Sequence, residues 1–139
     1  MAGTCNGASV ELKIPCRPEY VGVARLAILG VASRMKFSYD EVEDIRLAVG
    51  EACTIAVEWA QRNGKTDSCI DLKSMVSADK LEVDIYDHAG ERNEKPAGEE
   101  DQEAENLGAL LITLLVDEVV VNSHNEGTHV QMIKYAGER

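Results

Sequence analysis

The sequence predicts an α+β fold, a two-layer α/β sandwich in which three helices cover one face of a mixed, mainly antiparallel sheet. Three segments carry apolar residues at helical spacing, and five shorter segments alternate apolar and polar residues as strands do. Four of these strands form two consecutive hairpins, which favours antiparallel pairing. The three helices can then pack on one face of the sheet. The 139 residues contain no internal repeat, so we expect one domain spanning residues 1–139.

Prolines delimit the first strand and the first helix. Residues 1–8 are small and polar, which is typical of a disordered tail. Residues 10–14 alternate and are followed by Pro15, which indicates a strand at a sheet edge. Pro18 and Glu19 favour a helix start, because proline suits a first turn and glutamate suits the positive end of the dipole. The apolar stripe of this helix, within residues 20–35, is Val21, Ala24, Ile28, Val31 and Met35.

The segment from Ser38 to Arg62 has the strongest helical pattern in the chain. It opens with Ser38-x-x-Glu41, a capping box in which each side chain satisfies a free backbone N–H group. The stripe expected in the core is Val42, Ile45, Val49, Ala52, Ala56 and Trp59. A second, mixed face a third of a turn away carries Asp44, Ala48, Glu51 and Ile55. The pattern ends near Gly64.

A β-hairpin is expected next. Residues 70–76 alternate, residues 77–79 form a turn, and residues 81–85 alternate again. The segment 91–105 is polar and contains a proline and a glycine, so we expect a long mobile loop there.

A third helix and a second hairpin complete the fold. The leucines at helical spacing that make this helix amphipathic are Leu107, Leu110, Leu111, Leu114 and Leu115. Residues 119–122 and 128–135 are expected to pair around a turn at residues 125–127. Each predicted strand and helix thus has its own local signal.

The composition disfavours several kinds of partner. With 45% hydrophobic and 28% charged residues the chain is typical of a globular protein. No apolar run approaches the roughly 20 residues that span a bilayer, and no signal peptide is recognised, so we expect a cytoplasmic protein with no membrane partner. The net charge of −11 disfavours nucleic acid, whose phosphates need a basic face, and favours basic or neutral protein partners.

The cysteines and histidines show no metal-binding pattern. The four cysteines (Cys5, Cys16, Cys53 and Cys69) contain neither a C-x-x-C pair nor a regular framework. We expect them to be free thiols, as a reducing cytoplasm favours, with Cys53 and Cys69 buried. The three histidines add no metal-ligand spacing, and we predict no metal site.

Several strings together resemble one bacterial family. E-A-C-T-I-A-V begins at Glu51, I-P-x-R-P-E-Y-V-G at Ile14, and R-L-A-I-L-G-V-A-S-R-M at Arg25. Y-D-E-V-E-D-I-R-L-A-V begins at Tyr39, and L-V-D-E-V and a closing M-I-K-Y follow late in the chain. From about residue 10 to residue 135 the chain resembles anti-sigma factor serine kinases of the general-stress type. These belong to the superfamily of histidine kinases, gyrase and Hsp90, and the resemblance implies the histidine-kinase-like ATPase fold.

The resemblance also implies roles for single residues. Glu51 matches the family's catalytic base, and Asp87 matches an aspartate that reads the adenine amino group. Gly90 corresponds to the glycine after that aspartate, although D-x-G has become D-x-A-G here. Gly108 matches the glycine box that cradles phosphates, and Thr128 matches a threonine near the adenine.

The resemblance assigns a partner surface as well. Arg25 and Arg34 match the helix that contacts the sigma factor, and an antagonist of the anti-sigma factor competes for an overlapping surface. The family is usually homodimeric, and its nucleotide is ATP or ADP with Mg²⁺.

The chain departs from the family at the nucleotide site. Ile55 stands where the family has an asparagine that binds Mg²⁺, and Glu105 and Asn106 replace two glycines of the phosphate-binding box. Seven acidic residues between positions 91 and 105 face only Arg92 and Lys95, which would repel a triphosphate. We therefore expect weak or absent binding of Mg-ATP and Mg-ADP.

Three functions remain open at this stage. The first is an anti-sigma factor that sequesters a stress-type sigma factor and is released by partner switching. The second is an active ATP-dependent serine kinase that uses Glu51 as its base, and the third is a nucleotide-independent interaction module. Each site residue has a structural alternative too: Asp87 as a turn residue at the end of a strand, Glu51 as a helix residue bonded to a neighbour, and Arg25 as a surface arginine.

Overall fold

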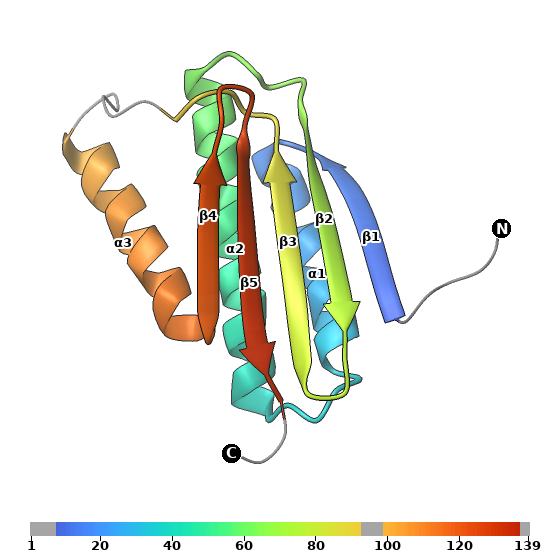
Figure 1. Ribbon diagram of the computed structural model, residues 1–139. Helices are drawn as coiled ribbons and strands as arrows, with labels where there is room; N and C mark the ends of the chain where they lie inside the picture. The colour runs from blue at the N-terminus through green and yellow to red at the C-terminus, as the bar shows by residue number, and fades with distance from the viewer. Residues whose placement is uncertain (1–7, 93–98, 137–139) are drawn as a thin grey trace, which may run out of the picture.

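Five strands form one sheet, and three helices lie against one of its faces in the computed structural model (Figure 1). The structure describes residues 8–92 and 99–136. The elements in chain order are β1 (Ala8–Pro15), a short 3₁₀ helix η1 (Pro18–Tyr20), α1 (Val21–Ala32), α2 (Tyr39–Arg62), β2 (Cys69–Val76), β3 (Lys80–Asp87), α3 (Glu99–Leu115), β4 (Glu118–Ser123) and β5 (Thr128–Tyr135). The predicted two-layer α+β fold is confirmed. Of the predicted tail at residues 1–8, residues 1–7 lie outside the described residues, whereas Ala8 already belongs to β1, which corrects the prediction at that position.

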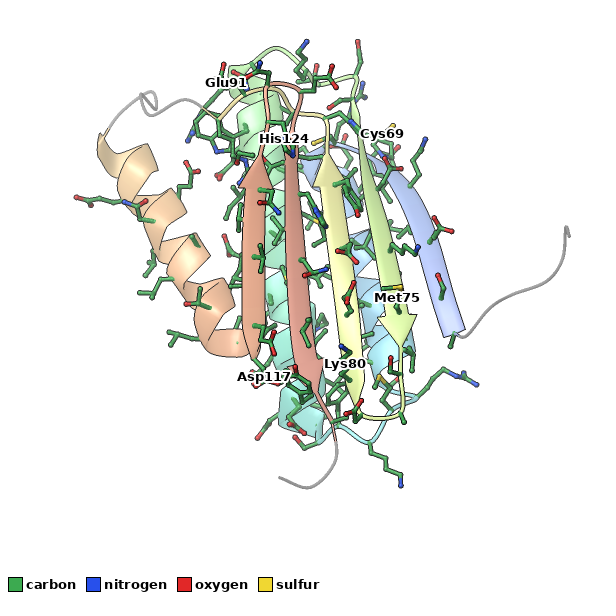
Figure 2. The ribbon with its side chains drawn as sticks, in the orientation of Figure 1. Cys69, Met75, Lys80, Glu91, Asp117 and His124 are labelled. Carbon is green, nitrogen blue, oxygen red and sulfur yellow. The ribbon has the colours of Figure 1, made fainter. Side chains whose placement is uncertain are left out.

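The sheet order brings two distant strand ends together. The strands run in the order β1-β2-β3-β5-β4, and every pairing among the described strands is antiparallel. β1 lies at an edge, as its following proline predicted. Because Tyr86 of β3 pairs with His129 of β5, the end of β3 at Asp87 meets the start of β5 at Thr128. Figure 2 shows Glu91 and His124 at this end of the sheet, and Lys80 and Asp117 at the other.

Helix α2 is the centre of the helical layer and packs against both α1 and α3. Its capping box forms as predicted, with Ser38 N donating to Glu41 Oε1 at 2.9 Å and Glu41 N donating to Ser38 Oγ at 3.1 Å. All six residues of its predicted apolar stripe are buried. α2 is the longest helix, yet no helix among the described residues is both long enough and apolar enough to span a membrane.

The carboxylate of Asp44 on the mixed face of α2 has a partner at the far end of the chain. Lys134 of β5 is buried, and its Nζ lies 3.7 Å from Asp44 Oδ2. The same Nζ donates to the carbonyl of Leu115 at 2.7 Å, where α3 ends. A cation at a helix C-terminus is favourable because unpaired carbonyls and the dipole are negative there. Lys134 therefore fixes the end of α3 to α2.

Helix α3 begins earlier than expected. Residues 91–105 were predicted to be a loop, but α3 already begins at Glu99, so the second half of that segment is helical. Glutamate, glutamine and alanine favour helices, and acidic residues suit the first turn. Residues 93–98 lie outside the described residues. Helix α1 is shorter than predicted, because it ends at Ala32 although the apolar stripe continues to Met35.

The leucines of α3 do not form a core stripe, which corrects the sequence interpretation. The buried positions of the described part of this helix are Gly108 and Ile112, and Val116 just beyond it is buried too. Four leucines are exposed, at 39% to 73% of their surface: Leu107, Leu110, Leu111 and Leu114. The narrow contact of α3 with α2 leaves these side chains on the outer side.

Candidate functional site

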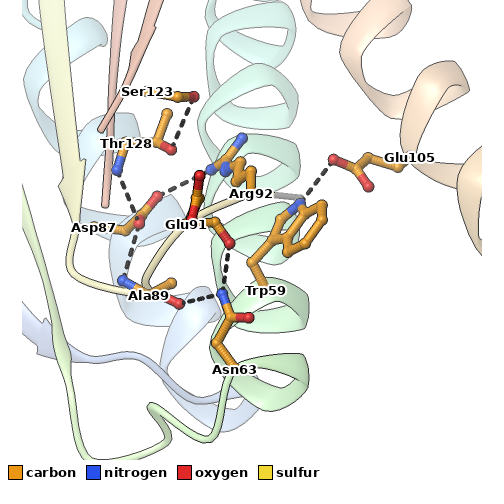
Figure 3. A network of polar contacts seen from close by, with 9 residues as sticks. All are labelled: Trp59, Asn63, Asp87, Ala89, Glu91, Arg92, Glu105, Ser123 and Thr128. Atoms are coloured by element: carbon orange, nitrogen blue, oxygen red, sulfur yellow. Dashed lines mark hydrogen bonds and ion pairs between the residues drawn. The ribbon is translucent and has the colours of Figure 1, made fainter. Parts of the chain in front are cut away.

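The buried carboxylate of Asp87 organises the end of β3. Its Oδ1 accepts hydrogen bonds from the backbone N–H groups of Ala89, at 3.1 Å, and Thr128, at 3.2 Å. Its Oδ2 is bonded by Arg92 Nη2 at 2.9 Å, as Figure 3 shows. Both oxygens therefore have donors from the chain itself, as a buried carboxylate requires. The hydroxyl of Thr128 lies 3.2 Å from Ser123 Oγ, so its backbone rather than its side chain contacts Asp87.

The segment after Asp87 is fixed by hydrogen bonds from two other loops. Asn63 at the end of α2 donates through Nδ2 to the carbonyls of Ala89, at 2.9 Å, and Glu91, at 2.8 Å. Gly90 N donates to Glu126 O at 3.0 Å. Gly90 has φ +88°, a conformation that favours glycine, and an added Cβ would lie 3.0 Å from Asn63 Nδ2. The predicted glycine position therefore has a conformational role, whereas the role of Asn63 was missed by sequence analysis.

Gly127 is a second residue that sequence analysis missed. A Cβ at this position would lie 1.9 Å from the carbonyl oxygen of Asp87. The backbone of the β4–β5 turn therefore passes directly against the end of β3, which only a glycine allows. The sequence signal was present, because the N-E-G turn was recognised, but a turn pattern does not show which strand lies beside it.

Glu105 is paired with α2. Its Oε1 accepts a hydrogen bond from Trp59 Nε1 at 2.7 Å, and its Oε2 from Arg62 Nη1 at 3.3 Å. The Arg62 guanidinium also lies 4.6 Å from the centre of the Trp59 ring. The charge expected to repel phosphates is thus held in a contact between two helices, with a cation beside it.

Glu51 and Gly108 meet at the crossing of α2 and α3. A Cβ on Gly108 would lie 2.6 Å from Glu51 Oε2, so the glycine lets α3 rest against the carboxylate. Glu51 is partly buried, and it has no hydrogen-bond or ion-pair partner within residues 8–92 and 99–136. Such a carboxylate is available to accept a proton. Ile55, one turn further along, is buried and offers no oxygen to a metal.

The space enclosed by these elements is small and apolar. A cavity of about 140 Å³ lies among α2, α3, β4 and β5. Its walls include Ile55, Arg92, Ile112, Val121 and Val130. Sites for small molecules usually measure about 300–1,000 Å³. With both oxygens of Asp87 bonded and no oxygen ligand at position 55, the residues as arranged do not fit a nucleotide with Mg²⁺.

A wider groove runs along the opposite side of α2, between it and α1. It measures about 570 Å³, and its walls include Val23, Arg25, Leu26 and Arg46. Leu26 is 70% exposed, and Arg25 is half-buried because its side chain lies across Gly50, where an added Cβ would be 2.2 Å from Arg25 Nε. Arg34 lies beyond the end of α1, is exposed, and is not among the residues that line the groove.

The cysteines described by the structure are free. Cys53 is buried as predicted, and so is Cys16, whereas Cys69 is only half-buried, which corrects the prediction for that residue. Cys5 lies outside the described residues. Burial raises the pKa of the Cys16 thiol to about 11 and that of Cys53 to about 12. Within the described ranges no cluster of His, Cys, Asp or Glu has the geometry of a metal site.

Comparison with known proteins identifies the family. The model of the histidine kinase-like ATPase domain matches residues 14–134, which is nearly the whole described chain. The chain belongs to this family. Nucleotide and Mg²⁺ are the general ligands of such an ATPase family. The cavity among α2, α3, β4 and β5, with Arg92 in its wall, is therefore the place to compare with a nucleotide site.

Similar proteins of the family are bacterial. The chain is 41% identical to the serine-protein kinase RsbW of Bacillus subtilis, covering 96% of this chain and 90% of that protein. It is 42% identical to RsbW of Bacillus velezensis, over 94% of this chain and 88% of the relative. RsbW of Listeria monocytogenes serovar 1/2a is 37% identical with the same coverage.

Solved structures show the same fold at low sequence identity. The RsbU and RsbW domains of a Mycobacterium tuberculosis protein superpose with a TM-score of 0.72 at 13% identity, covering 94% of this chain and 33% of that one. The histidine kinase domain of a blue-light activated kinase from Erythrobacter litoralis gives a TM-score of 0.57 at 22% identity, covering 87% of this chain and 61% of that one.

Proposed function

We propose that the protein is an anti-sigma regulatory factor that binds and sequesters a stress-type sigma factor. An anti-sigma antagonist would release the sigma factor by partner switching. The observation that carries this proposal is the open groove between α1 and α2, in a chain about 40% identical to RsbW proteins over most of its length. The net charge of −11 suits a basic partner.

The groove has the features of a protein-binding surface. Val23 and Leu26 present apolar area in the groove, and the guanidinium of Arg25, which also lines it, lies against Gly50 of α2. Exposed apolar side chains that gather on one surface are typical of an interaction site. Arginine is among the residues that most often dominate the binding energy of an interface. A partner helix could place its apolar face in such a groove.

The proposed role does not depend on tight nucleotide binding. The cavity of about 140 Å³, the Arg92–Asp87 ion pair and Ile55 all support weak or absent binding of Mg-ATP and Mg-ADP. We extend the proposal to a cytoplasmic homodimer, whose oligomeric state sedimentation analysis would measure.

An active serine kinase is the second candidate, and a specific observation favours it. The Glu51 carboxylate has no partner within the described residues and is available as a base, and the relatives named above are called serine-protein kinases. Transfer of labelled phosphate to an antagonist protein would move this candidate to first place. A nucleotide-independent interaction module for another signalling protein is the third candidate, and failure to bind any sigma factor would favour it.

Two matched leucine substitutions test the proposed surface. Leu26 on α1 and Leu114 on α3 are exposed to a similar extent, 70% and 73%. We expect Leu26→Asp to abolish capture of a stress-type sigma factor in a titration, because it places a charge in the groove. Leu114→Asp adds the same charge outside the groove and should leave binding within about twofold. Equal effects of the two substitutions would contradict the assignment of the surface.

A further inference from the structure

The carboxylate of Asp87 is bonded by two fixed donors and one movable donor. The backbone N–H groups of Ala89 and Thr128 contact Oδ1 and are held by the chain around them. The third donor is the side chain of Arg92, whose Nη2 lies 2.9 Å from Oδ2 (Figure 3). A ligand that donates a hydrogen bond to this oxygen along the direction that Arg92 now takes must therefore replace this side chain.

Arg92 occupies a position that an ordinary surface arginine avoids. Its side chain is 16% exposed, and the carboxylate it contacts is 2% exposed. Its Nε is buried without a hydrogen-bond partner among the described residues. Removing such a donor from water costs stability, which pairing with Asp87 offsets. One ion pair thus holds the arginine side chain inward, while its Nε donor has no acceptor among the described residues.

The chain leads Arg92 into the pocket from a fixed base. Asn63 holds the carbonyls on either side of Gly90, and Glu126 accepts from the Gly90 N–H group. Arg92 follows two residues later and forms a wall of the cavity together with Ile55 and Val130. Loss of the side chain alone would join the space it fills to the cavity of about 140 Å³.

A guanidinium and an amino-bearing nucleobase offer the same chemistry to this site. Both are planar, and both direct an N–H donor in the plane at a carboxylate oxygen. The remaining walls of the cavity are mostly apolar, which suits the faces of a flat ring.

We propose that Arg92 is a displaceable internal occupant of the base-binding part of the pocket and competes with an amino-bearing nucleobase for Asp87. The inference rests on the proposed function only in treating this pocket as the nucleotide site of the ATPase family. According to this inference, nucleotide affinity depends on Arg92 as well as on the altered phosphate box.

Adenosine tests the binding of the base without any contribution from phosphates. It carries the amino group but no phosphate, so the missing metal ligand at position 55 and the charge of Glu105 do not affect its binding. We expect Arg92→Ala to bind adenosine at least about tenfold more tightly than the unmodified protein in isothermal titration calorimetry. Inosine should show no such gain, because it presents a carbonyl oxygen to Asp87 where adenosine presents an amino group.

Arg62→Ala is the matched control for charge. It removes a partly buried arginine from the same end of the molecule, but Arg62 pairs with Glu105 instead of Asp87. Its adenosine affinity should equal that of the unmodified protein. An equal gain in this variant, an equal gain for inosine, or no gain in Arg92→Ala would each overturn the proposal.

A second variant covers the case in which Arg92→Ala fails to fold. Arg92→Val keeps a short apolar side chain against the cavity wall but neither fills the space of the guanidinium nor donates to Asp87, and it should gain adenosine affinity in the same direction. If both variants unfold in circular dichroism melting, the arginine is required by the fold and the proposal is overturned. Titration of the unmodified protein with a sigma factor is a separate measurement. Absence of sigma-factor binding would contradict the proposed function, and the adenosine measurements would still test the role of Arg92.

Discussion

The end of β3 and the groove along α1 lie on either side of α2, and they differ in where their arginines find partners. At the end of β3, Arg92 pairs with Asp87 and Arg62 pairs with Glu105, so the cations are bonded within the chain. In the groove, Arg46 pairs only with Glu43, one turn away on the same helix. Arg25 has no ion pair within the described residues and lies across a glycine. One region is closed by its own charges and the other remains open.

A site can therefore close without a change of fold. Buried charges must be paired, and an acidic residue at a ligand-binding position can be satisfied by a nearby arginine once no ligand is required. A groove at the surface has no such requirement, because water solvates its charges. The core beneath both regions is the same layer of α2 and the sheet, so closure of one region leaves the other intact.

The largest effect is expected from Gly127→Ala. The added methyl group would meet the backbone carbonyl of Asp87 at 1.9 Å, and neither strand end can move away cheaply. We expect a loss of at least about 3 kcal/mol in the free energy of unfolding, measured by urea denaturation. Gly30→Ala is the control, because nothing lies within 4 Å of the added atom and alanine favours a helix. A milder effect at Gly127 than at Gly30 would show that the closed end is not rigid.

A smaller effect is expected from Arg25→Ala, on binding. Removal of an arginine anchor from an interface often costs more than about 2 kcal/mol, which calorimetry with the sigma factor would measure. Because Arg25 packs against Gly50, we expect a loss of folding stability as well, of less than about 1 kcal/mol.

Arg34→Ala tests how far the partner-binding surface extends along the molecule. Arg34 is outside the groove, and its role in partner binding stays a prediction. A loss of affinity equal to that of Arg25→Ala would extend the surface beyond the end of α1, whereas unchanged affinity would restrict it to the groove.

Restoring the nucleotide residues should act non-additively. Ile55→Asn returns a metal ligand, and Glu105→Gly with Asn106→Gly returns the glycine box. Metal and phosphates bind as one unit, so the triple variant should gain at least about tenfold in Mg-ATP affinity beyond the product of the separate gains.

Glu105→Gly also removes the acceptor of Trp59 Nε1, and the free energy of unfolding should fall by about 1–3 kcal/mol. Tight Mg-ATP binding by the unmodified protein would instead show that the closed end opens readily.

The smallest effect concerns the thiols beneath both regions. Burial raises the pKa of Cys16 to about 11 and that of Cys53 to about 12, so both stay protonated at about pH 8. The thiolate is the reactive form, and its fraction rises only as pH approaches these values. In a kinetic assay with a thiol reagent the half-buried Cys69 should react faster than Cys16 and Cys53. Rapid labelling of Cys53 would indicate that α2 separates from the sheet.

Local patterns in the sequence determined the elements and most of the core. The capping box of Ser38 and Glu41 and the apolar stripe of α2 depend on residues three or four positions apart, and both were predicted correctly. The hairpins followed from alternation and turn residues, and the sheet order places Asp87 beside Thr128.

Contacts between distant side chains depend on how the helices and strands pack. Asp44 pairs with Lys134 and Glu105 with Trp59 across long stretches of chain, and no local period reports such contacts. Periodicity marked the leucines of α3 as one face but could not show that α2 contacts a neighbouring face through Gly108. Arg92 entered the sequence analysis only as a positive charge among acidic residues. Its contact with Asp87 depends on Asn63, which holds the intervening turn, and a side chain near a chain reversal can point inward or outward with the same sequence.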